Sequence, residues 1–351
     1  VLGYEHLWKA IIRPPRANYE LKDMGPQKFI TNGIEGGSFK VQRTDFTLVN
    51  GRGHDIICSH FEPYEEDRQY RTMPCVVYMH GNSSCRLESL DCINYLLPLN
   101  ITLFCFDFSG CGMSQGEYIS LGWWEREDIA MIIDHLRAER RVSTIGLWGR
   151  SMGAVTALLH ADRDHTIAGL VLDSPFSNLP KLANELAYQY MKIPNMFVNP
   201  ILKMVASSIK SKADFDIYHL SPIDHVSKAF IPALFATAKD DDFVAPHHTK
   251  KLHDAYSGDK NLVEFEGDHN STRPQFFYDS ASFFLMDALQ CTSVLNAEGN
   301  KFTKAQLTER KEEIKKSKRA KRKAEEEKKR EESGPKKPLS RVNMSSLMAP
   351  Q

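Results

Sequence analysis

The 351-residue sequence contains no run of about 18 uncharged apolar residues, so it predicts no membrane-spanning helix. Its first residues, VLGYEHLWKAIIRPPR, hold no long apolar stretch that ends at a small-residue cleavage site, which argues against a secretory signal. Glycine and proline are also too few for a collagen-like chain, with 20 and 17 residues respectively. The remaining composition, 42% hydrophobic and 26% charged, is typical of a globular protein.

Paired cysteine spacing is missing as well. The seven cysteines are odd in number and none stands in a CxxC pair. Cys58, Cys75 and Cys105 lie in apolar, strand-like runs, where a reduced thiol packed in the core is the simplest expectation. We therefore expect a reducing compartment and a cytoplasmic protein.

The net charge of zero conceals an uneven distribution of charge. Residues 301–351 hold 17 of the 45 Lys and Arg residues but only 8 of the 45 Asp and Glu residues. The preceding 300 residues are therefore mildly acidic, and the C-terminal part is basic.

Apolar runs typical of buried strands alternate with stretches of helical periodicity. Two strand-like runs near 45–50 and 55–63 flank Gly51-Arg52-Gly53, which predicts a hairpin. Further strands are expected at 74–80, 101–108, 143–149, 167–174, 231–238 and 261–267, and helices at 87–98, 123–140, 152–160, 247–256 and 274–289. This alternation predicts the α/β class, with a mostly parallel sheet covered by helices on both faces.

The sequence Gly149-Arg150-Ser151-Met152-Gly153 is a G-x-S-x-G motif between an expected strand and an expected helix. This context creates a sharp turn that exposes the serine hydroxyl at the carboxyl edge of a sheet. A Cβ at Gly149 or Gly153 would collide with the neighbouring backbone in so tight a turn. We predict that Ser151 is a nucleophile; the structural alternative is a serine N-cap in a glycine turn.

A serine nucleophile needs a general base, and the base needs an orienting acid. His269 directly follows the expected strand at 261–267, so it is the predicted base. The acid must follow the strand at 231–238, where Asp240, Asp241 and Asp242 stand in a row. The spacing acid-x-x-aliphatic, completed by Val244, favours Asp241 over Asp242 and, least, Asp240. His247 and His248 open a helix, so we expect them to be capping or surface residues.

The negative charge that forms on the substrate during acyl transfer requires at least two N–H donors. One expected donor is the backbone N–H of Met152, directly after the nucleophile. The other is the backbone N–H of Asn82, in the His80-Gly81-Asn82 turn after the strand at 74–80. Arg150 has two open interpretations: it contacts the substrate, or it pins the nucleophile turn to an acidic neighbour. The histidines and acids form no ligand cluster in the sequence, so we expect no metal and no cofactor.

The segments HGNSS, DFSGCGMSQGEY, GRSMG, AKDDDFV and EGDHNS occur in an order that resembles the α/β-hydrolase superfamily. The resemblance covers about residues 40–290. Phrases such as LWGRSMGAVTALLH and LDSPFSNL are similar to a eukaryotic subgroup of serine-aminopeptidase-like (hydrolase 4) proteins, related to Bem46- and ABHD17-like hydrolases. The resemblance implies an α/β-hydrolase fold and a catalytic triad, but it does not identify a substrate.

The resemblance also implies a division of the chain. We expect an irregular N-terminal segment over 1–40, an α/β-hydrolase domain over 41–295 and, inside it, a helical cap over about 176–230. The cap sequence 181–210 is rich in Met and other apolar residues, which suits an acyl-binding lid or plain packing of cap helices.

The charged C-terminal part predicts a separate structure. A solvated helix is expected over 296–333, because it has almost no apolar stripe but several Glu-to-Lys pairs at i,i+4. Residues 334–351 are expected to be a disordered basic tail. Such a tail is a solubilising extension or a tether to an acidic partner, either a membrane surface or an acidic protein filament. No nucleic-acid-binding fold accompanies it, so nucleic acid is not an expected partner.

Two classes of function follow from these features. The first is a serine esterase or thioesterase that acts on a small molecule or an acylated protein, with peptidase activity as a lesser variant. The second is a hydrolase fold that serves as a scaffold subunit and docks through its N-terminal segment and basic tail.

Overall fold

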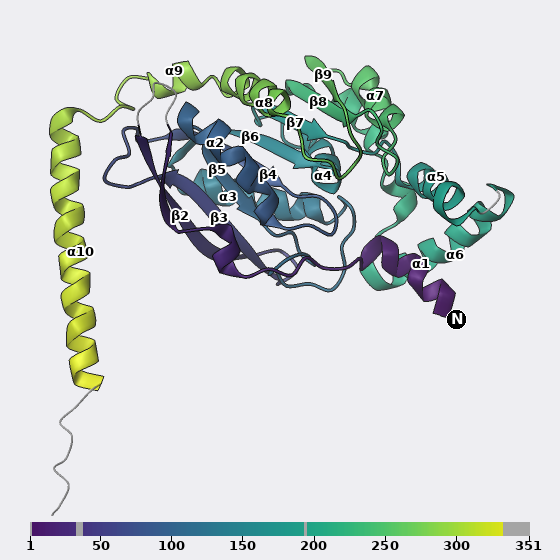
Figure 1. The fold of residues 1–351 in the computed structure, drawn as a ribbon, viewed down its shortest axis with the longest axis horizontal. Coiled ribbons are helices and arrows are strands. Elements are labelled where there is room, and N and C mark those ends of the chain that lie inside the picture. The colour runs from purple at the N-terminus through teal and green to yellow at the C-terminus, as the bar shows by residue number, and fades with distance from the viewer. Residues whose placement is uncertain (1, 33–37, 193–194, 333–351) are drawn as a thin grey trace, which may run out of the picture. The chain divides into compact units, whose positions relative to one another are not determined.

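The computed structural model of the chain describes residues 2–32, 38–192 and 195–332 (Figure 1). Its contacts divide it into two units, Val1–Lys301 and Phe302–Gln351. The first unit contains a nine-stranded sheet in the order β1-β2-β3-β5-β4-β6-β7-β8-β9. The strands are β1 Lys28–Asn32, β2 Ser38–Val49, β3 Asp55–Pro63, β4 Met73–Met79, β5 Thr102–Phe106, β6 Val142–Arg150, β7 Gly169–Asp173, β8 Ala233–Ala238 and β9 Lys260–Phe265.

The sheet is antiparallel at one edge and parallel elsewhere. Strands β1, β2, β3 and β5 pair antiparallel, whereas β5, β4, β6, β7, β8 and β9 pair parallel. Every residue of β4, β5, β7 and β8 is buried. Strands buried on both faces require continuous apolar runs, which is the pattern that the sequence shows. The predicted α/β class and mostly parallel sheet are confirmed.

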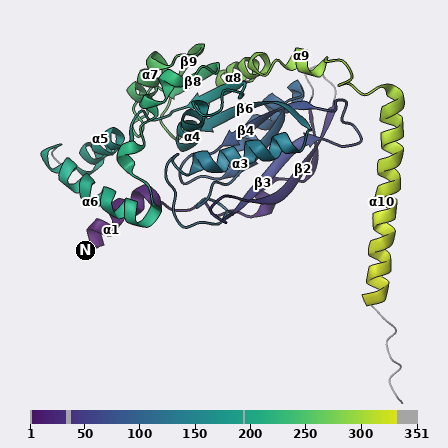
Figure 2. The same ribbon diagram turned by 180° about the vertical axis from the view of Figure 1, so that it is seen from behind.

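Helices cover both faces of this sheet. The α-helices of the first unit are α1 Leu2–Ile12, α2 Ile93–Leu96, α3 Glu125–Ala138, α4 Met152–Ala161, α5 Leu179–Met191, α6 Asn195–Ala213, α7 Pro246–Ala255, α8 Gln275–Ala288 and α9 Cys291–Leu295. Short 3-10 helices are η1 Leu21–Met24, η2 Arg86–Cys92, η3 Leu97–Leu99, η4 Ile217–His219, η5 Pro222–Asp224 and η6 Val226–Lys228. Residues of α3 and α4 build one core cluster, and residues of α2 and α8 build the other. In Figure 1, α2 and α8 lie on the side of the sheet that faces the viewer. In Figure 2, which is the opposite view, α3 and α4 lie on the near side.

The insertion between β7 and β8 consists of α5, α6 and η4 to η6, where the sequence predicts a cap over about 176–230. Residues 193 and 194, between α5 and α6, lie outside the described residues. The apolar side chains of α5 and α6 divide into two groups. Leu182, Leu202, Val205 and Ile209 are at most 6% exposed and belong to the core, whereas Tyr188, Tyr190 and Met204 are 56–61% exposed.

The expectation that residues 1–40 are irregular is wrong. Helix α1 and strand β1 both lie in this segment. Trp8 and Ile12 on α1 are at most 5% exposed and pack in the core cluster. The Ile12 carbonyl accepts a 2.8 Å hydrogen bond from the Ile119 N–H, and the Tyr4 hydroxyl donates to the Met204 carbonyl of the cap at 2.7 Å. These distant contacts, invisible in the local sequence, stabilise α1.

The second unit contains the charged helix, which is shorter than the expected span of 296–333. Helix α10 covers Lys304–Glu332. Thr303 sets its start, because its N–H donates to the Gln306 side chain at 3.0 Å and its hydroxyl accepts from the Gln306 N–H at 3.3 Å. The predicted disordered tail, 334–351, lies outside the described residues. The acidic partner of this part of the chain stays a prediction.

Two further expectations concern the whole chain. The seven cysteines are all free and buried. Burial raises the pKa of the Cys75 thiol to about 12, as expected of an inert core thiol. No described helix combines the length and the apolar character needed to cross a membrane. The cytoplasmic location stays a prediction.

Candidate active site

Ser151 lies in the turn between β6 and α4, and its backbone is strained. Its φ of 52° and ψ of −113° fall in a region that residues other than glycine rarely adopt. A Cβ at Gly149 would collide with the Gly153 backbone, and one at Gly153 would collide with the Met79 carbonyl. Two glycines are therefore required for α4 to leave the sheet so steeply and to present Ser151 at the carboxyl end of β6.

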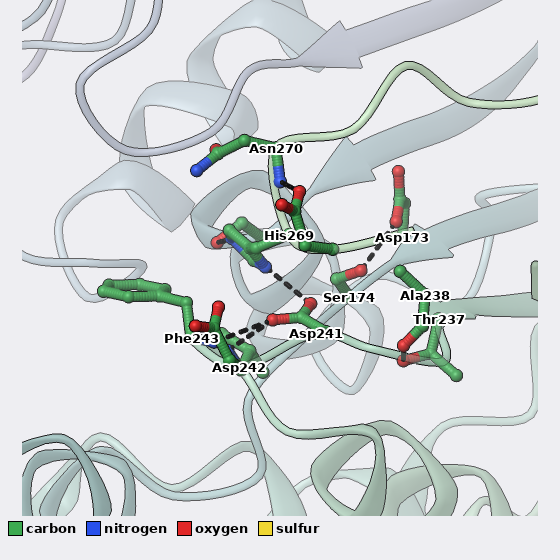
Figure 3. A network of polar contacts seen from close by, with 12 residues as sticks. Asp173, Ser174, Thr237, Ala238, Asp241, Asp242, Phe243, His269 and Asn270 are labelled. Carbon is green, nitrogen blue, oxygen red and sulfur yellow. Dashed lines mark hydrogen bonds and ion pairs between the residues drawn. The ribbon is translucent and has the colours of Figure 1, made fainter. Parts of the chain in front are cut away.

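The structure brings Ser151, His269 and Asp241 together. His269 Nε2 lies 3.1 Å from Ser151 Oγ, and His269 Nδ1 lies 2.7 Å from Asp241 Oδ2. Figure 3 shows the His269 ring pointing at the Asp241 carboxylate. All three residues are at most 9% exposed, so water competes little for these hydrogen bonds. Since Asp241 accepts at Nδ1, this nitrogen carries the proton of the neutral ring and Nε2 faces the serine as an acceptor.

The structure also separates the three consecutive aspartates. Asp241 Oδ1 accepts hydrogen bonds from the N–H groups of Phe243 and Val244 at 3.1 and 2.7 Å, which turn its other oxygen toward His269. Asp242 Oδ2 instead accepts from the Tyr190 hydroxyl of α5 at 3.0 Å. Asp240 is exposed. Only Asp241 therefore lies in position to orient the His269 ring.

The turn that carries Asn82 lies beside the nucleophile. A Cβ at Gly81 would stand 3.8 Å from the Ser151 Cβ, so the two turns are in van der Waals contact. Within the described residues, no hydrogen bond uses the backbone N–H of Asn82 or that of Met152. The Met152 N–H also belongs to the first turn of α4, where the helix dipole favours negative charge. Both N–H groups thus remain available for an oxyanion next to Ser151.

The buried side chain of His80 and the part-buried side chain of Glu88 fix the turn at Gly81. The Phe108 N–H donates to His80 Nε2 at 3.1 Å, so the proton on His80 Nδ1 is donated to the Gly81 carbonyl at 2.7 Å. Glu88 accepts the Gly81 N–H at 3.0 Å and forms an ion pair with Arg150, 3.6 Å apart. Of the two interpretations of Arg150, the structure supports the pin to an acidic neighbour.

A second network holds the His269 loop, and sequence reasoning missed it. Arg273 donates to both carboxylate oxygens of Asp173, at 2.7 and 3.0 Å, and to the His269 carbonyl at 3.2 Å. Arg150 donates to the same carbonyl at 2.8 Å. Asp173 ends β7, and its own carbonyl accepts the Ser151 N–H at 2.7 Å. Asp173 therefore holds the backbone of Ser151 directly and the backbone of His269 through Arg273.

Electrostatics favour the charged form of this buried pair. Burial alone would raise the pKa of Asp173, but the charge and hydrogen bonds of Arg273 outweigh burial and lower that pKa below its usual value of 3.8. A signal was present in the sequence: Asp173 directly follows the apolar strand residues 167–172, at the same sheet edge as Ser151. The sequence around its partner Arg273, 100 residues further along the chain, gave no indication of this ion pair.

Aromatic side chains flank the site: Tyr190 belongs to the cap sequence expected to suit an acyl-binding lid, whereas Phe243 was missed. The Phe243 ring is 5.2 Å from the His269 ring, centroid to centroid, and Phe243 is 38% exposed. Tyr190 reaches the same loop from the cap through its contact with Asp242. Together they form an apolar surface beside the base that a substrate can contact.

Sequence comparisons find hydrolases among the proteins similar to this chain. Residues 71–217 match a family model described as serine aminopeptidase, S33. The uncharacterized protein YqkD of Bacillus subtilis is 29% identical over 66% of this chain and 74% of its own length. Lysophosphatidylserine lipase ABHD12 of Rattus norvegicus is 25% identical over 62% of this chain, and human monoglyceride lipase 28% identical over 50%. These matches, together with the fold, support membership of the α/β-hydrolase superfamily.

Solved structures show the same fold at low identity. Esterase Pf2001 of Pyrococcus furiosus superposes with a TM-score of 0.57 and 18% identity, covering 78% of this chain and 98% of the esterase. Acetyl xylan esterase 1 of Thermoanaerobacterium superposes with a TM-score of 0.56 and 16% identity, covering 81% of this chain and 93% of the esterase. The chain spans about half the length of the two lipase relatives, 52% and 59%. The relatives support a hydrolase; the narrower Bem46- and ABHD17-like subgroup stays a prediction.

Replacing Arg273 with Met should destabilise the fold by about 3–5 kcal/mol, because it leaves the Asp173 carboxylate buried and unpaired. The matched control is Arg163→Met. Arg163 also binds a carboxylate, that of Glu127, with two hydrogen bonds, but this pair is about 40% exposed. The control should change stability by less than about 1 kcal/mol. Urea denaturation at neutral pH measures both, and equal effects would contradict a special role of the Asp173–Arg273 pair.

Proposed function

We propose that this protein is a serine hydrolase that cleaves carboxylic esters or thioesters through an acyl-enzyme on Ser151. The observation that carries the proposal is the buried hydrogen-bonded chain from Asp241 through His269 to Ser151, with distances of 2.7 and 3.1 Å. This chain of hydrogen bonds ends on a strained turn that presents the serine oxygen at the carboxyl end of β6. The relatives named as lipases and esterases support the same reaction class.

In the first half of the reaction, His269 Nε2 takes the proton of Ser151 as its Oγ forms a bond to the substrate carbonyl carbon. The carbonyl π electrons move onto oxygen, and the backbone N–H groups of Asn82 and Met152 stabilise the resulting oxyanion. The Asp241 carboxylate stabilises the imidazolium that His269 has become. The oxyanion then collapses, the bond to the leaving group breaks, and His269 gives its proton to the departing oxygen or sulfur.

In the second half, water replaces the leaving group. His269, neutral again, takes a proton from the water while the water oxygen attacks the acyl carbon. The second oxyanion uses the same two N–H groups. Its collapse breaks the bond to Ser151 Oγ, which regains the proton from His269, and a carboxylic acid is released. The enzyme returns to its starting state, and one water molecule is consumed for each ester or thioester cleaved.

The substrate class rests on the surroundings of His269. Phe243 and the cap residue Tyr190 present apolar surface beside the base, and the relatives include lipases, which by name act on lipids. We therefore propose an ester or thioester with an apolar acyl part. The buried apolar residues of α5 and α6 pack in the core, so acyl binding falls to the exposed aromatic residues Phe243 and Tyr190.

The function as a serine hydrolase is tested with a fluorophosphonate probe, which forms a covalent bond only with an activated serine. Wild type should be labelled, and Ser151→Ala should not, because the variant lacks the attacking oxygen. Ser280→Ala is the matched control, since Ser280 is on α8 and its hydroxyl donates to the Phe276 carbonyl. Folded wild-type protein that is not labelled would contradict the proposal and favour the scaffold alternative.

The choice of acid is tested by two neighbouring substitutions. An Asn amide at position 241 would donate to His269 Nδ1 and force the proton onto Nε2, so that the ring no longer accepts the serine proton. Asp241→Asn should therefore lower kcat by about 10³–10⁴-fold. Asp242→Asn leaves the hydrogen bonds of His269 intact, so kcat should change by less than about tenfold. Hydrolysis of a p-nitrophenyl ester measures both, and a larger loss in Asp242→Asn would overturn the assignment.

The substrate class is tested by varying the length of the acyl chain. Each buried CH2 contributes about 0.8 kcal/mol, so p-nitrophenyl octanoate should exceed the acetate in kcat/KM by at least about tenfold. Phe243→Ala removes apolar surface beside His269 and should reduce this preference. A preference for acetate in wild type would contradict an apolar acyl site while leaving the serine mechanism intact.

A further inference from the structure

Glu185, His247 and His248 form a cluster outside the triad that joins the cap to the body. Glu185 lies on α5, and the two histidines lie in the first turn of α7. Glu185 Oε1 is 3.1 Å from His247 Nε2, and Oε2 is 2.9 Å from His248 Nε2. One ligand atom from each residue lies within 4.8 Å of the others. We propose that these three residues bind a divalent transition-metal ion of the Zn²⁺ class, which fastens α5 to α7.

The donor set suits such an ion. Two imidazole nitrogens and one carboxylate are the protein ligands of many zinc sites in which water takes the fourth position. Imidazole donors select Zn²⁺, Ni²⁺ or Cu²⁺ over Mg²⁺ and Ca²⁺, which prefer oxygen. A cavity of about 550 Å³ borders Glu185 and is also lined by Asn178, Lys181 and Tyr188, so an ion and its water ligands have a path to the cluster.

His248 has the surroundings expected of a ligand. Its side chain is 0% exposed. Its other nitrogen, Nδ1, lies 2.8 Å from the Ser177 hydroxyl and 3.2 Å from the Ser177 N–H. This serine fixes the ring orientation, as residues around metal ligands do. The prediction that His248 caps the helix or lies on the surface is therefore wrong; His247, 47% exposed, is a surface residue.

Binding of the ion requires a change of tautomer at His248. The Ser177 N–H makes Nδ1 an acceptor, so without metal the proton is on Nε2 and is donated to Glu185. With metal on Nε2, the proton moves to Nδ1 and is donated to the Ser177 hydroxyl, which rotates to accept it. The contact with the Ser177 N–H is then lost. The ring stays neutral in both states, so this step releases no proton.

Two positive charges near the cluster oppose binding of a metal ion. Lys181 lies 3.8 Å from Glu185 Oε1, and the first turn of α7 carries the positive end of a helix dipole. The Glu185 carboxylate compensates both charges. Without a metal, Glu185 simply bridges the two histidines by hydrogen bonds. The two possibilities differ in whether Zn²⁺ binds the folded chain with the stoichiometry and the residue dependence of a single site.

A metal at this position would act on the proposed active site through α5. The same helix carries Tyr190, whose hydroxyl donates to Asp242, the neighbour of Asp241. Fastening α5 to α7 therefore holds the cap against the loop that carries the acid. This consequence rests on the proposed function, whereas the metal site does not.

The site is tested by isothermal titration of the chelator-treated full chain with Zn²⁺ in the Ser151→Ala background, which excludes the triad serine as a ligand. We expect one ion per chain. Glu185→Gln and His247→Gln should each weaken binding by at least about tenfold, because each removes one of three ligands. His165→Gln is the control: this exposed histidine packs against Phe230, and its loss should leave the affinity unchanged.

Absence of binding, or equal binding in Glu185→Gln and in the His165→Gln control, would overturn the metal site. The effect on the cap is measured separately, by ester hydrolysis of wild type with and without Zn²⁺. A rate that responds to Zn²⁺ in wild type but not in Glu185→Gln supports the connection to the active site. Failure of all ester hydrolysis would contradict the proposed function and leave the titration result standing.

Discussion

The hydrogen bond from the Ser151 N–H to the Asp173 carbonyl, 2.7 Å long, connects the two halves of the site. It extends the parallel pairing of β6 and β7 by one step beyond the register Arg150–Asp173, into the strained turn. The Asp173 carboxylate then holds Arg273, and Arg273 and Arg150 hold the His269 carbonyl. The distance between His269 and Ser151 thus depends on the end of one strand. Because the pair is buried, loss of either charge would leave the other unpaired in a medium of low dielectric constant.

Much of this site could be predicted because its requirements are local. Gly149 and Gly153 are needed wherever a strand turns so sharply into a helix, and the order of Ser151, Asp241 and His269 follows from the order of the strands. The sheet was predictable for a similar reason, since short continuous apolar runs that alternate with helices are typical of parallel strands buried on both faces. The choice among three adjacent aspartates rested on one turn residue, Val244, whose N–H does bind Asp241.

The rest depends on contacts between residues far apart in sequence. Arg273 and Asp173 are separated by 100 positions, and the sequence around neither residue indicates that the two form a pair. Helix α1 lacks a helical pattern strong enough to predict it; Trp8 and Ile12 are buried because the cap and the loop before α3 cover them. His248 at a helix start has the sequence context of a capping residue. It is fully buried because its ring lies between Glu185 of α5 and Ser177 before that helix, contacts that the local sequence does not indicate.

Helix α1 changes how the cap can move. An insertion is ordinarily joined to its domain by two chain connections, here at the ends of β7 and β8, and can rotate about the line between them. The contact of Tyr4 with Met204 adds to the contacts that Glu185 and Tyr190 of the cap make with the body, and the bond between Ile12 and Ile119 anchors the other end of α1 in the body. Any displacement of the cap from the body would have to break this contact of α1 as well as those of α5, so the first helix of the chain helps to hold the cap in place.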